Sequence, residues 1–344
     1  MVFTTPAIGA LRRHFPTARL TYLVEPSAAP VVEHDPAIDE TIVVARPRGV
    51  RRILYDLSLA RRLRAARFDL VIDFHGGPRS AWLTRATGAP TRVGYAVPGR
   101  AWAYTLRVPW SPNLTPPRHS VLNQWDLLTP LGIGMPDPST DPVHMTLDPT
   151  AERRVDARLH AAGVSGDSSL VVMHVSAGNP FRRWPAASFA TVAATLAADD
   201  PSRRIVITSG PSDADAAIAI AERARAQAGA GRRHQIVRID EFDLAELGWL
   251  LRRARLFIGG DSGPLHVAAT TRVPVVAIFG PTLPERSLPW RDPAIPSTPV
   301  DAGSLPCRPC HQRHCIPGDF RCLTSIAPQQ VIDASRRIIS VAER

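Results

Sequence analysis

One segment of the carboxyl-terminal half, GGDSGPLH from Gly259 to His266, combines glycines, an acid, a hydroxyl and an imidazole. An apolar run precedes it and a helical pattern follows, so it is expected at the carboxyl end of a strand, where a parallel sheet faces its ligand. Ser262 is expected to cap the helix, whose free N–H groups attract an anion, most naturally a diphosphate. Asp261 would orient His266 or the loop, and His266 would donate to a phosphate oxygen. A well-capped helix with a partly buried histidine is the structural alternative.

The cysteines form the second group that could do chemistry. All four fall within 307–322, with the spacing C-x2-C-x4-C-x6-C. Four thiolates this close together can bind Zn²⁺ tetrahedrally, but the usual second C-x2-C pair is absent. We therefore expect loop-stabilising thiols without a metal, and keep a metal site as the alternative, for Cys307, Cys310, Cys315 and Cys322. Because no signal-peptide pattern opens the sequence, a reducing compartment is expected and a disulfide framework is not.

The formal net charge is +10, and all 41 basic residues are arginine. Two interpretations stay open: the codon bias of a GC-rich genome, and attraction to anionic partners such as phospholipid head groups, phosphorylated glycans or nucleic acid. The absence of lysine excludes a Schiff-base lysine, a Walker A lysine and a kinase-type catalytic lysine. Any phosphate must therefore be held by arginine, by backbone N–H groups or by helix N-termini.

The elements that position these residues alternate between strand and helix. Short β-branched runs predict strands at 19–24, 41–44, 69–74, 170–175, 204–208, 235–239, 256–259 and 273–279. A helical period predicts helices at 6–15, 51–67, 79–86, 121–131, 151–162, 186–198, 213–227, 244–253, 264–270 and 328–341. This alternation indicates an α/β fold of parallel sheets with helices on both faces.

The length of 344 residues predicts two domains, and four prolines within 135–150 mark a boundary. We expect an amino-terminal domain at 1–135, a linker at 136–150, a carboxyl-terminal domain at 151–327 and a final helix at 328–344. Hydrophobic residues make up 44% and charged residues 21%, which excludes disorder as the main state. The longest clean apolar run, Val273–Phe279, is too short to span a bilayer.

Several segments, taken together and in order, resemble the bacterial glycosyltransferase family 9. They are DSGPLHVAA followed by FGPT, HVSAGNPFRRWP at 174–185, DEFDLAELGWLL at 240–251, FDLVIDFHGGPRS at 68–80, and a Cys-rich tail at 307–331 like that of heptosyltransferase II-type members. The resemblance covers nearly the whole chain, and the motifs are specific to the family when they are taken together. It implies the GT-B fold, with two doubly wound Rossmann-like domains facing a cleft. The resemblance also implies that the first strand of the amino-terminal domain is missing from this sequence.

The resemblance also assigns donor-binding residues in the carboxyl-terminal domain. The donor diphosphate loop is matched by Asp261, Ser262, Gly263 and His266. Ser176 matches a second loop that contacts phosphate. Arg182 stands where family members commonly carry lysine, and a guanidinium keeps the charge with a different geometry. The alternative for Arg182 and its neighbour Arg183 is a solvated surface pair.

Two further donor contacts are implied less specifically. Phe242 lies where the family's chain passes the nucleotide base, so its ring would stack on adenine or, equally, belong to the core. Asp213 or Asp215 would accept the ribose hydroxyls, unless these acids only complement the helix dipole. On the acceptor side, Arg79 would grip an acidic group such as a carboxylate or a phosphorylated heptose. Weaker candidates for the same cleft are His75, Arg118 and His119.

The family's candidate catalytic base is an aspartate in a Gly-Asp loop after the first strand. Here the run from Val2 to Ala7, VFTTPA, resembles the helix entry that follows this loop. The aspartate is therefore expected before Met1 and has no number in this sequence. A misplaced start codon is the favoured interpretation, and a real truncation that leaves a non-catalytic protein is the other.

The function implied is an inverting heptosyltransferase that moves heptose from ADP-heptose to the inner core of lipopolysaccharide, without a cofactor. The acceptor would be a lipid-linked core oligosaccharide, and the protein would bind the anionic cytoplasmic face of the inner membrane peripherally. The main alternative is a family 9 relative that binds nucleotide sugar or glycan without transfer. A nucleotide-sugar 2-epimerase would not explain the motif set, and nucleic-acid binding is disfavoured because no basic tract with interleaved aromatics occurs.

Overall fold

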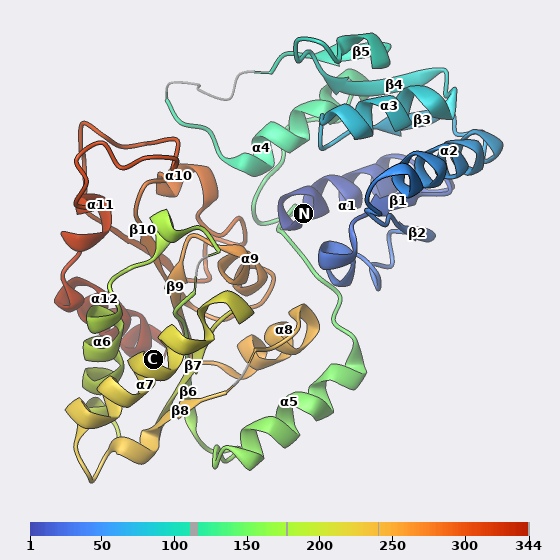
Figure 1. Ribbon diagram of the computed structural model, residues 1–344. Helices are drawn as coiled ribbons and strands as arrows, with labels where there is room; N and C mark the ends of the chain where they lie inside the picture. The colour runs from blue at the N-terminus through green and yellow to red at the C-terminus, as the bar shows by residue number, and fades with distance from the viewer. Residues whose placement is uncertain (111–115, 177, 240, 343–344) are drawn as a thin grey trace. The chain divides into compact units, whose positions relative to one another are not determined.

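The computed structural model describes residues 1–110, 116–176, 178–239 and 241–342 (Figure 1). It divides into a first compact unit, Phe3–Asp141, and a second that begins at Pro142. The division falls inside the segment where a linker is expected. Val143, Met145 and Leu147 are nevertheless buried, and the Val143 N–H donates to the Trp290 carbonyl at 3.0 Å. The second half of the expected linker therefore packs as part of the second unit.

The second unit contains a six-stranded, all-parallel sheet in the order β11-β10-β9-β6-β7-β8. Its strands are β6 (Ser169–His174), β7 (Arg203–Thr208), β8 (Ile236–Arg238), β9 (Leu256–Gly260), β10 (Val275–Phe279) and β11 (Ser297–Asp301). Numbered within the unit, this order reads 6-5-4-1-2-3, which is the doubly wound order. Its first strand, β6, is central and pairs with both β7 and β9.

Helices cover both faces of this sheet (Figure 1). One group of packed helices is α6 (Ala186–Asp199), α7 (Ala214–Ala228) and α12 (Pro328–Ala342). The other is α5 (Pro149–Ala161), α8 (Leu244–Arg253) and α9 (Gly263–Ala269). Short helices lie at α10 (Pro284–Ser287) and α11 (Arg321–Thr324). Because both faces are covered, every residue of β9 and β10 is buried.

Helix α8 illustrates how its local sequence determines where it begins and how it packs. Asp243 accepts from the Glu246 N–H at 2.7 Å while the Glu246 carboxylate accepts from the Asp243 N–H at 3.2 Å, a capping box that fixes the first turn. Gly248 faces the chain at 143–147, where a Cβ would lie 2.5 Å from a Leu147 methyl group. A glycine at this position therefore lets α8 pack closely against that segment.

The first unit holds two smaller parallel sheets, β1-β2 and β3-β4-β5. The strands are β1 (Thr21–Val24), β2 (Glu40–Val43), β3 (Leu70–Ile72), β4 (Thr91–Tyr95) and β5 (Leu106–Val108), and the helices are α1 (Thr5–His14), α2 (Val50–Ala65), α3 (Pro78–Thr87) and α4 (Ser120–Trp125). Among the described residues of this unit, no strand pairs with both β1 and β3.

Three strands were not expected from the sequence: β4, β5 and β11. Each is short or carries an arginine, glycine or proline that weakens the apolar pattern of a strand. The helix expected at 121–131 is also wrong in part, because it is α-helical only to Trp125 and continues as a 3-10 helix over Asp126–Leu131. Pro130 lacks the N–H that another α-helical turn would need. Within the described ranges, no helix is both long and apolar enough to cross a membrane.

Candidate functional site

Asp261 is the centre of a buried polar cluster at the carboxyl end of β9. Its side chain is 4% exposed and accepts from the Thr282 hydroxyl at 2.6 Å and the Ser287 hydroxyl at 3.1 Å. A guanidinium nitrogen of Arg182 lies 3.1 Å from Asp261 Oδ2, and His266 Nε2 lies 3.7 Å from Oδ1. Because a buried charge is tolerated only when it is paired and hydrogen-bonded, these contacts hold the loop in one arrangement.

Arg182 joins the Asp261 loop to two other segments. Its Nη1 also donates to the Asp261 carbonyl at 2.9 Å, and its Nε donates to Gln312 Oε1 at 2.7 Å. It ends the short 3-10 helix Pro180–Arg182, whose first turn is capped by the Asn179 side chain. The Arg182 side chain keeps 29% of its surface exposed. A fixed, partly exposed guanidinium beside a glycine-rich loop is suited to binding an anion.

Ser262 and Gly263 follow Asp261 and open helix α9. The Ser262 hydroxyl donates to the Gly260 carbonyl at 3.3 Å and makes no cap bond, so the expected Ser262 cap is wrong. The Ser262 backbone is extended, which is the usual conformation for the residue that precedes a helix. Pro264 stands in the first turn, as expected. Nothing lies within 4 Å of a Cβ placed on Gly263, so the backbone is open there.

A second buried carboxylate, Asp213, lies after β7. Ser176 and Ser212 donate hydroxyl hydrogen bonds to its Oδ2, and Arg183 lies 2.7 Å from its Oδ1. Both carboxylate oxygens are thus engaged within the chain, and they join the loops that follow β6 and β7. The ribose contact of Asp213 and the phosphate contact of Ser176 stay predictions.

His174 is the last residue of β6 and precedes the loop that contains Ser176. Its Nδ1 is 3.0 Å from Thr208 Oγ1 at the end of β7. Burial lowers the pKa of His174 to about 4, and the nearby Asp213 opposes this shift only partly. The imidazole is therefore neutral near pH 7 and serves as a buried link between two strands.

Phe242 is placed after β8, but its ring is buried, with 8% of the residue exposed. The Arg158 guanidinium lies over it, 4.0 Å from the ring centroid. Arg158 is itself held by the Glu246 carboxylate at 2.8 Å. One face of the ring is thus covered by a cation–π contact, and stacking on adenine stays a prediction. The neighbouring residue 240 lies outside the described ranges.

In the first unit the corresponding feature is Asp73, which follows β3 and is buried. Its Oδ1 accepts from the N–H groups of His75 at 3.0 Å and Gly76 at 2.9 Å, and its Oδ2 accepts from the Tyr104 hydroxyl at 2.8 Å. Gly76 adopts φ +63, a left-handed conformation that suits glycine. The loop is closed further by Arg100, which donates to the Gly76 carbonyl at 2.8 Å. Asp73 therefore shapes the loop that carries the candidate acceptor residues.

Arg79 follows this loop at the start of α3. It grips Asp56 of α2 through its Nε at 3.0 and 3.2 Å and donates to the Ala45 carbonyl at 3.0 Å. Both charged side chains are 16% exposed. Arg79 is therefore already paired with a carboxylate in the chain, and its contact with an acidic acceptor stays a prediction.

The weaker acceptor candidates also have local partners. Arg118 pairs with Asp126 at 2.8 Å, and His119 Nδ1 accepts from the Val121 N–H at 3.1 Å. His75 is exposed, and its ring lies where a Cβ on Gly77 would be. These hydrogen bonds and ion pairs give Arg118 and His119 structural roles.

Sequence reasoning missed several partners in both clusters. They are Thr282, Ser287, Gln312, Arg183, Asp73, Tyr104 and Asp56. The FGPT motif was noticed, but nothing local signals that its threonine bonds to Asp261, 21 positions away. Asp73 had a usable signal, because an acid two residues before a His-Gly-Gly turn can accept hydrogen bonds from the backbone of that turn and hold it.

A family model described as glycosyltransferase family 9 (heptosyltransferase) matches residues 57–319. The chain belongs to glycosyltransferase family 9. The matched range includes the Asp73 loop of the first unit and the Asp261 cluster of the second.

Individual relatives of this family 9 protein cover nearly all of it. Lipopolysaccharide heptosyltransferase 3 of Escherichia coli is 27% identical over 318 residues, which are 91% of this chain and 90% of that protein. A glycosyltransferase family 9 structure from Veillonella parvula has a TM-score of 0.83 at 24% identity, covering 99% and 94% of the two chains. The Escherichia coli heptosyltransferase WaaC, solved with ADP-2-deoxy-2-fluoro heptose, has a TM-score of 0.67 at 18% identity, covering 99% and 95%. These similarities show the GT-B fold with its two Rossmann-like domains.

Proposed function

We propose that this family 9 protein transfers heptose from ADP-heptose to the inner core of lipopolysaccharide. The observation that carries the proposal is the Asp261 cluster, which holds Arg182 and His266 around an open, glycine-bearing turn at the carboxyl edge of a doubly wound sheet. Such an edge is where nucleotide ligands bind in this class of fold. The family model and the relative named as a lipopolysaccharide heptosyltransferase support the same donor and acceptor.

In the proposed reaction an acceptor hydroxyl attacks the anomeric carbon of heptose in one inverting displacement. A new C–O bond forms, the bond to the diphosphate oxygen breaks, ADP leaves, and the hydroxyl proton passes to a base. Arg182, His266 and the backbone at Ser262–Gly263 would bind the diphosphate and stabilise the charge that develops on it. No residue of this sequence is assigned as the base.

For the acceptor we propose the first unit, around Arg79. An acidic acceptor would compete with Asp56 for the Arg79 guanidinium, since one fork cannot hold two carboxylates at once in the same geometry. A charge-neutral acceptor would leave the pair unchanged. An Asp56→Asn variant should therefore bind an acidic core oligosaccharide more tightly than the wild type.

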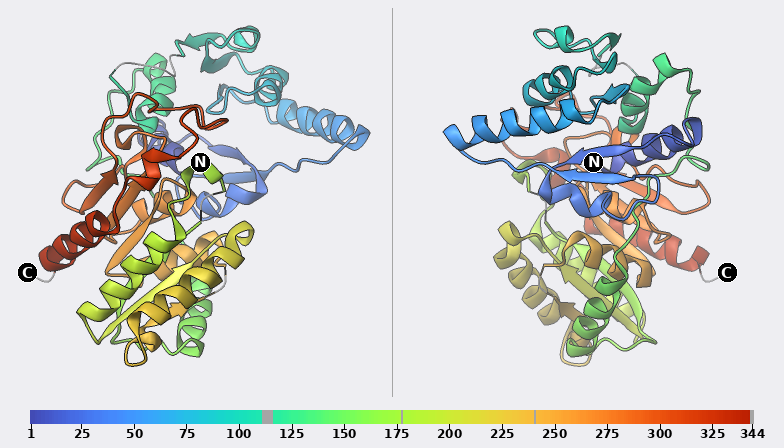
Figure 2. Two further views of the ribbon diagram at one scale, coloured as in Figure 1. Left: turned by 60° about the vertical axis from the view of Figure 1, so that its left-hand side comes forward. Right: turned by 90° about the vertical axis from the view of Figure 1, so that its right-hand side faces the viewer.

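We also propose that helix α2 places the first unit on an anionic membrane surface at the cytoplasmic face of the inner membrane. The amino-terminal end of α2 extends away from the rest of its unit in both views of Figure 2. Its outer face bears exposed apolar side chains at helical spacing, Val50, Ile53, Leu54 and Leu57. Arg61 and Arg64 are exposed farther along the same face. Apolar residues next to arginine suit the boundary between head groups and acyl chains.

Vesicles with and without anionic lipid test this surface. Arg61→Gln should weaken the binding that salt removes, and Leu54→Gln should weaken the binding that remains at high salt. Ile218→Gln changes an exposed residue of α7 in the second unit and serves as the matched control. Equal vesicle binding by all three variants would contradict the assignment to α2.

A donor screen tests the central proposal. Release of nucleotide is measured from ADP-heptose, UDP-sugars and GDP-sugars, with and without a lipopolysaccharide core acceptor. We expect release from ADP-heptose only, dependent on the acceptor. Release from the other donors would overturn the donor assignment. Binding of ADP-heptose without transfer would favour the alternative of a family 9 protein that binds its ligands and does not turn them over.

A further inference from the structure

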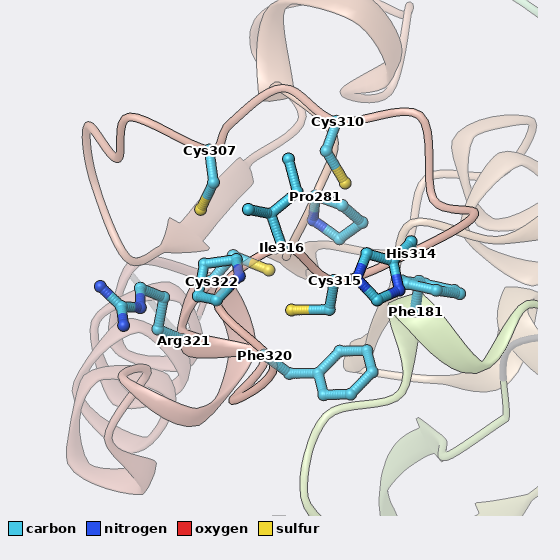
Figure 3. A pocket seen from close by; sticks show the side chains of 11 residues that line it. Phe181, Pro281, Cys307, Cys310, His314, Cys315, Ile316, Phe320, Arg321 and Cys322 are labelled. Carbon is cyan, nitrogen blue, oxygen red and sulfur yellow. The ribbon is translucent and has the colours of Figure 1, made fainter.

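The four cysteines of residues 307–322 line a cavity of the second unit, with a volume of about 40 Å³ (Figure 3). A space of this size holds no more than a few water molecules. All four thiols are free, and no three Cys, His, Asp or Glu side chains in the described ranges are placed to hold a metal ion. The cavity therefore gives no support to a ligand site, and the expected role of the thiols in stabilising the loop stays a prediction.

The exposed tryptophans, by contrast, all lie in the first unit. Seven tryptophans occur in the sequence, and the three exposed ones are Trp82, Trp102 and Trp110. Trp110 is 42% exposed, and its ring packs against Tyr95 with the two ring centroids 4.7 Å apart. Tyr95 is itself buried, so it is a firm support for the indole. A supported indole with few rotatable bonds offers a large apolar surface to a ligand at a small cost in entropy.

Trp110 lies at the carboxyl edge of the sheet β3-β4-β5. It comes two residues after β5 ends, Tyr95 is the last residue of β4, and the Asp73 loop follows β3. This edge of a doubly wound sheet is where ligands bind. Neighbouring strands are about 4.8 Å apart, so β3 and β5 are separated by about 10 Å, a distance that one oligosaccharide can span. A glycan held near Arg79, which follows the Asp73 loop, can therefore also reach Trp110.

The Arg118–Asp126 ion pair supplies polar groups close to Tyr95. Arg118 Nη2 donates to Asp126 Oδ1 at 2.8 Å, and Nη1 donates to Oδ2. The Tyr95 hydroxyl donates to the carbonyl of Asn123, which lies between the two charged residues in the sequence, at 2.7 Å. Burial raises the pKa of Tyr95, Asp126 raises it further and Arg118 opposes the shift, so both charges act on its hydroxyl. The two charged side chains are 26% and 27% exposed, which leaves part of each open to a ligand.

We propose that Trp110, Arg118 and Asp126 form a subsite for one pyranose ring of the acceptor oligosaccharide. A pyranose ring has an apolar C–H face, which packs on an aromatic ring, and a rim of hydroxyls, which hydrogen-bond with charged groups. The Asp126 carboxylate would accept from hydroxyls, and the Arg118 guanidinium would donate to their oxygens.

The pairing of these features favours a sugar over a lipid tail. An acyl chain would cover the Trp110 indole, but it would also take water away from the ion pair without replacing its hydrogen bonds, which is costly. A sugar covers the indole and keeps the charged groups hydrogen-bonded. The subsite rests on the proposed acceptor, and it extends the contact at Arg79 from one acidic group to a further sugar of the same glycan.

Calorimetric titration with a deacylated lipopolysaccharide core oligosaccharide tests the aromatic part of the subsite without a membrane or a donor. Trp110→Ala should weaken oligosaccharide binding about tenfold, the effect of losing one aromatic contact. Trp110→Phe, which keeps an aromatic face, should recover part of the affinity. Trp102→Ala removes another exposed indole of the same unit and should bind like the wild type. Equal affinity of Trp110→Ala and the wild type would overturn the proposal, as would a loss confined to Trp102→Ala.

A second pair of variants tests the polar part. Asp126→Asn removes the charge that pairs with Arg118 and should weaken oligosaccharide binding about fivefold. Asp39→Asn changes another ion-paired carboxylate of the same unit, the partner of Arg12, and should leave the affinity unchanged. Wild-type affinity in Asp126→Asn would remove the ion pair from the subsite. Circular dichroism shows whether each variant is folded, and the Trp110 variants remain decisive if Asp126→Asn is not.

Transfer assays separate the subsite from the proposed function. Trp110→Ala should raise the KM for the core acceptor more than it lowers kcat, and its ADP affinity should be unchanged. Transfer with an unchanged acceptor KM would overturn the subsite and leave the proposed function standing. Oligosaccharide binding that depends on Trp110, without any transfer of heptose, would do the opposite. A Trp110→Ala variant that loses affinity only for the acylated acceptor would overturn the sugar assignment in favour of an acyl chain.

Discussion

The two units use different means to hold a polar loop at the end of a strand. In the second unit a central strand, β6, joins β7 and β9 into one sheet, so the loops after neighbouring strands are fixed relative to one another by backbone hydrogen bonds. In the first unit β1-β2 and β3-β4-β5 are separate sheets. There the Asp73 loop depends on side-chain contacts from Tyr104 and Arg100.

Because of this difference, the positions of the loops are fixed in different ways in the two units. The loops around Asp213 and Asp261 inherit their relative positions from a shared sheet, and side-chain contacts add to that framework. The Asp73 loop is fixed one contact at a time, so single substitutions should loosen it gradually. We therefore expect large, cooperative effects in the second unit and smaller, local effects in the first.

The largest effect is expected from Val172→Asp in β6. Val172 is fully buried and pairs with Val206 and Phe257 on the two neighbouring strands. An unpaired buried charge there should lower the free energy of unfolding by at least about 3 kcal/mol. Arg107→Asp, on the exposed edge strand β5, is the control and should change it by less than about 0.5 kcal/mol. Urea unfolding followed by circular dichroism measures both, and similar midpoints would refute the comparison.

The next effect is the pH dependence contributed by His174. The unfolded chain binds a proton at this residue with the ordinary pKa near 6.5, whereas the folded chain does so only near pH 4. Between these values the unfolded state binds more protons, so this contribution is complete above pH 6.5 and is lost as pH falls toward 4. It amounts to roughly 3 kcal/mol. His174→Gln should flatten this part of the stability profile, and an unchanged slope would contradict the assignment.

A smaller effect concerns the donor loop and does not require unfolding. His266→Ala should weaken ADP binding about ten- to a hundredfold, the loss of one charge-assisted hydrogen bond of roughly 1.5–3 kcal/mol. His160→Ala, at an exposed position of α5, is the control and should leave ADP binding unchanged. Isothermal calorimetry measures both. Unchanged ADP affinity in His266→Ala would remove His266 from the donor site.

The smallest effect is expected in the first unit. Tyr104→Phe removes one of the three hydrogen bonds to Asp73 and should cost about 1.5 kcal/mol of stability, the low end for a hydrogen bond to a charged group. Tyr55→Phe removes a more exposed hydrogen bond, from the Ala45 N–H, and should cost less. Neither change should alter ADP affinity, because both lie in the unit without the donor loop. A Tyr104→Phe variant that loses ADP binding would show that the two units are not independent.

The sequence predicted much of the second unit because its signals are local. Helix α8 begins and ends where it was expected, since a capping box and an apolar period lie within 243–253. The glycine-rich turn likewise identified Asp261 and its neighbours. The contacts that complete the site were not predictable in this way. Gln312 and Arg182 are separated by 130 positions, and only the folded chain brings them together.

In the first unit the local signals are weaker. Strand β4, TRVGY, contains an arginine and a glycine, and its pairing with β3 depends on residues far along the chain. The basic character of Arg79 was evident from the sequence, but its partner Asp56 lies on another helix. The sequence shows that a residue is charged, but only the folded chain shows which residue pairs with it.

Gly248 and Leu147 approach each other closely, so substitutions at these two positions should depend on each other. A methyl group at 248 would come within 2.5 Å of a Leu147 methyl group, and a Met145 carbon lies 3.0 Å away. Gly248→Ala or a larger residue at 147 would thus each be selected against alone. A paired change, with alanine at 248 and a smaller apolar residue at 147, would preserve the volume of the contact. Related sequences are therefore expected to vary at these two positions together, as a compensated pair.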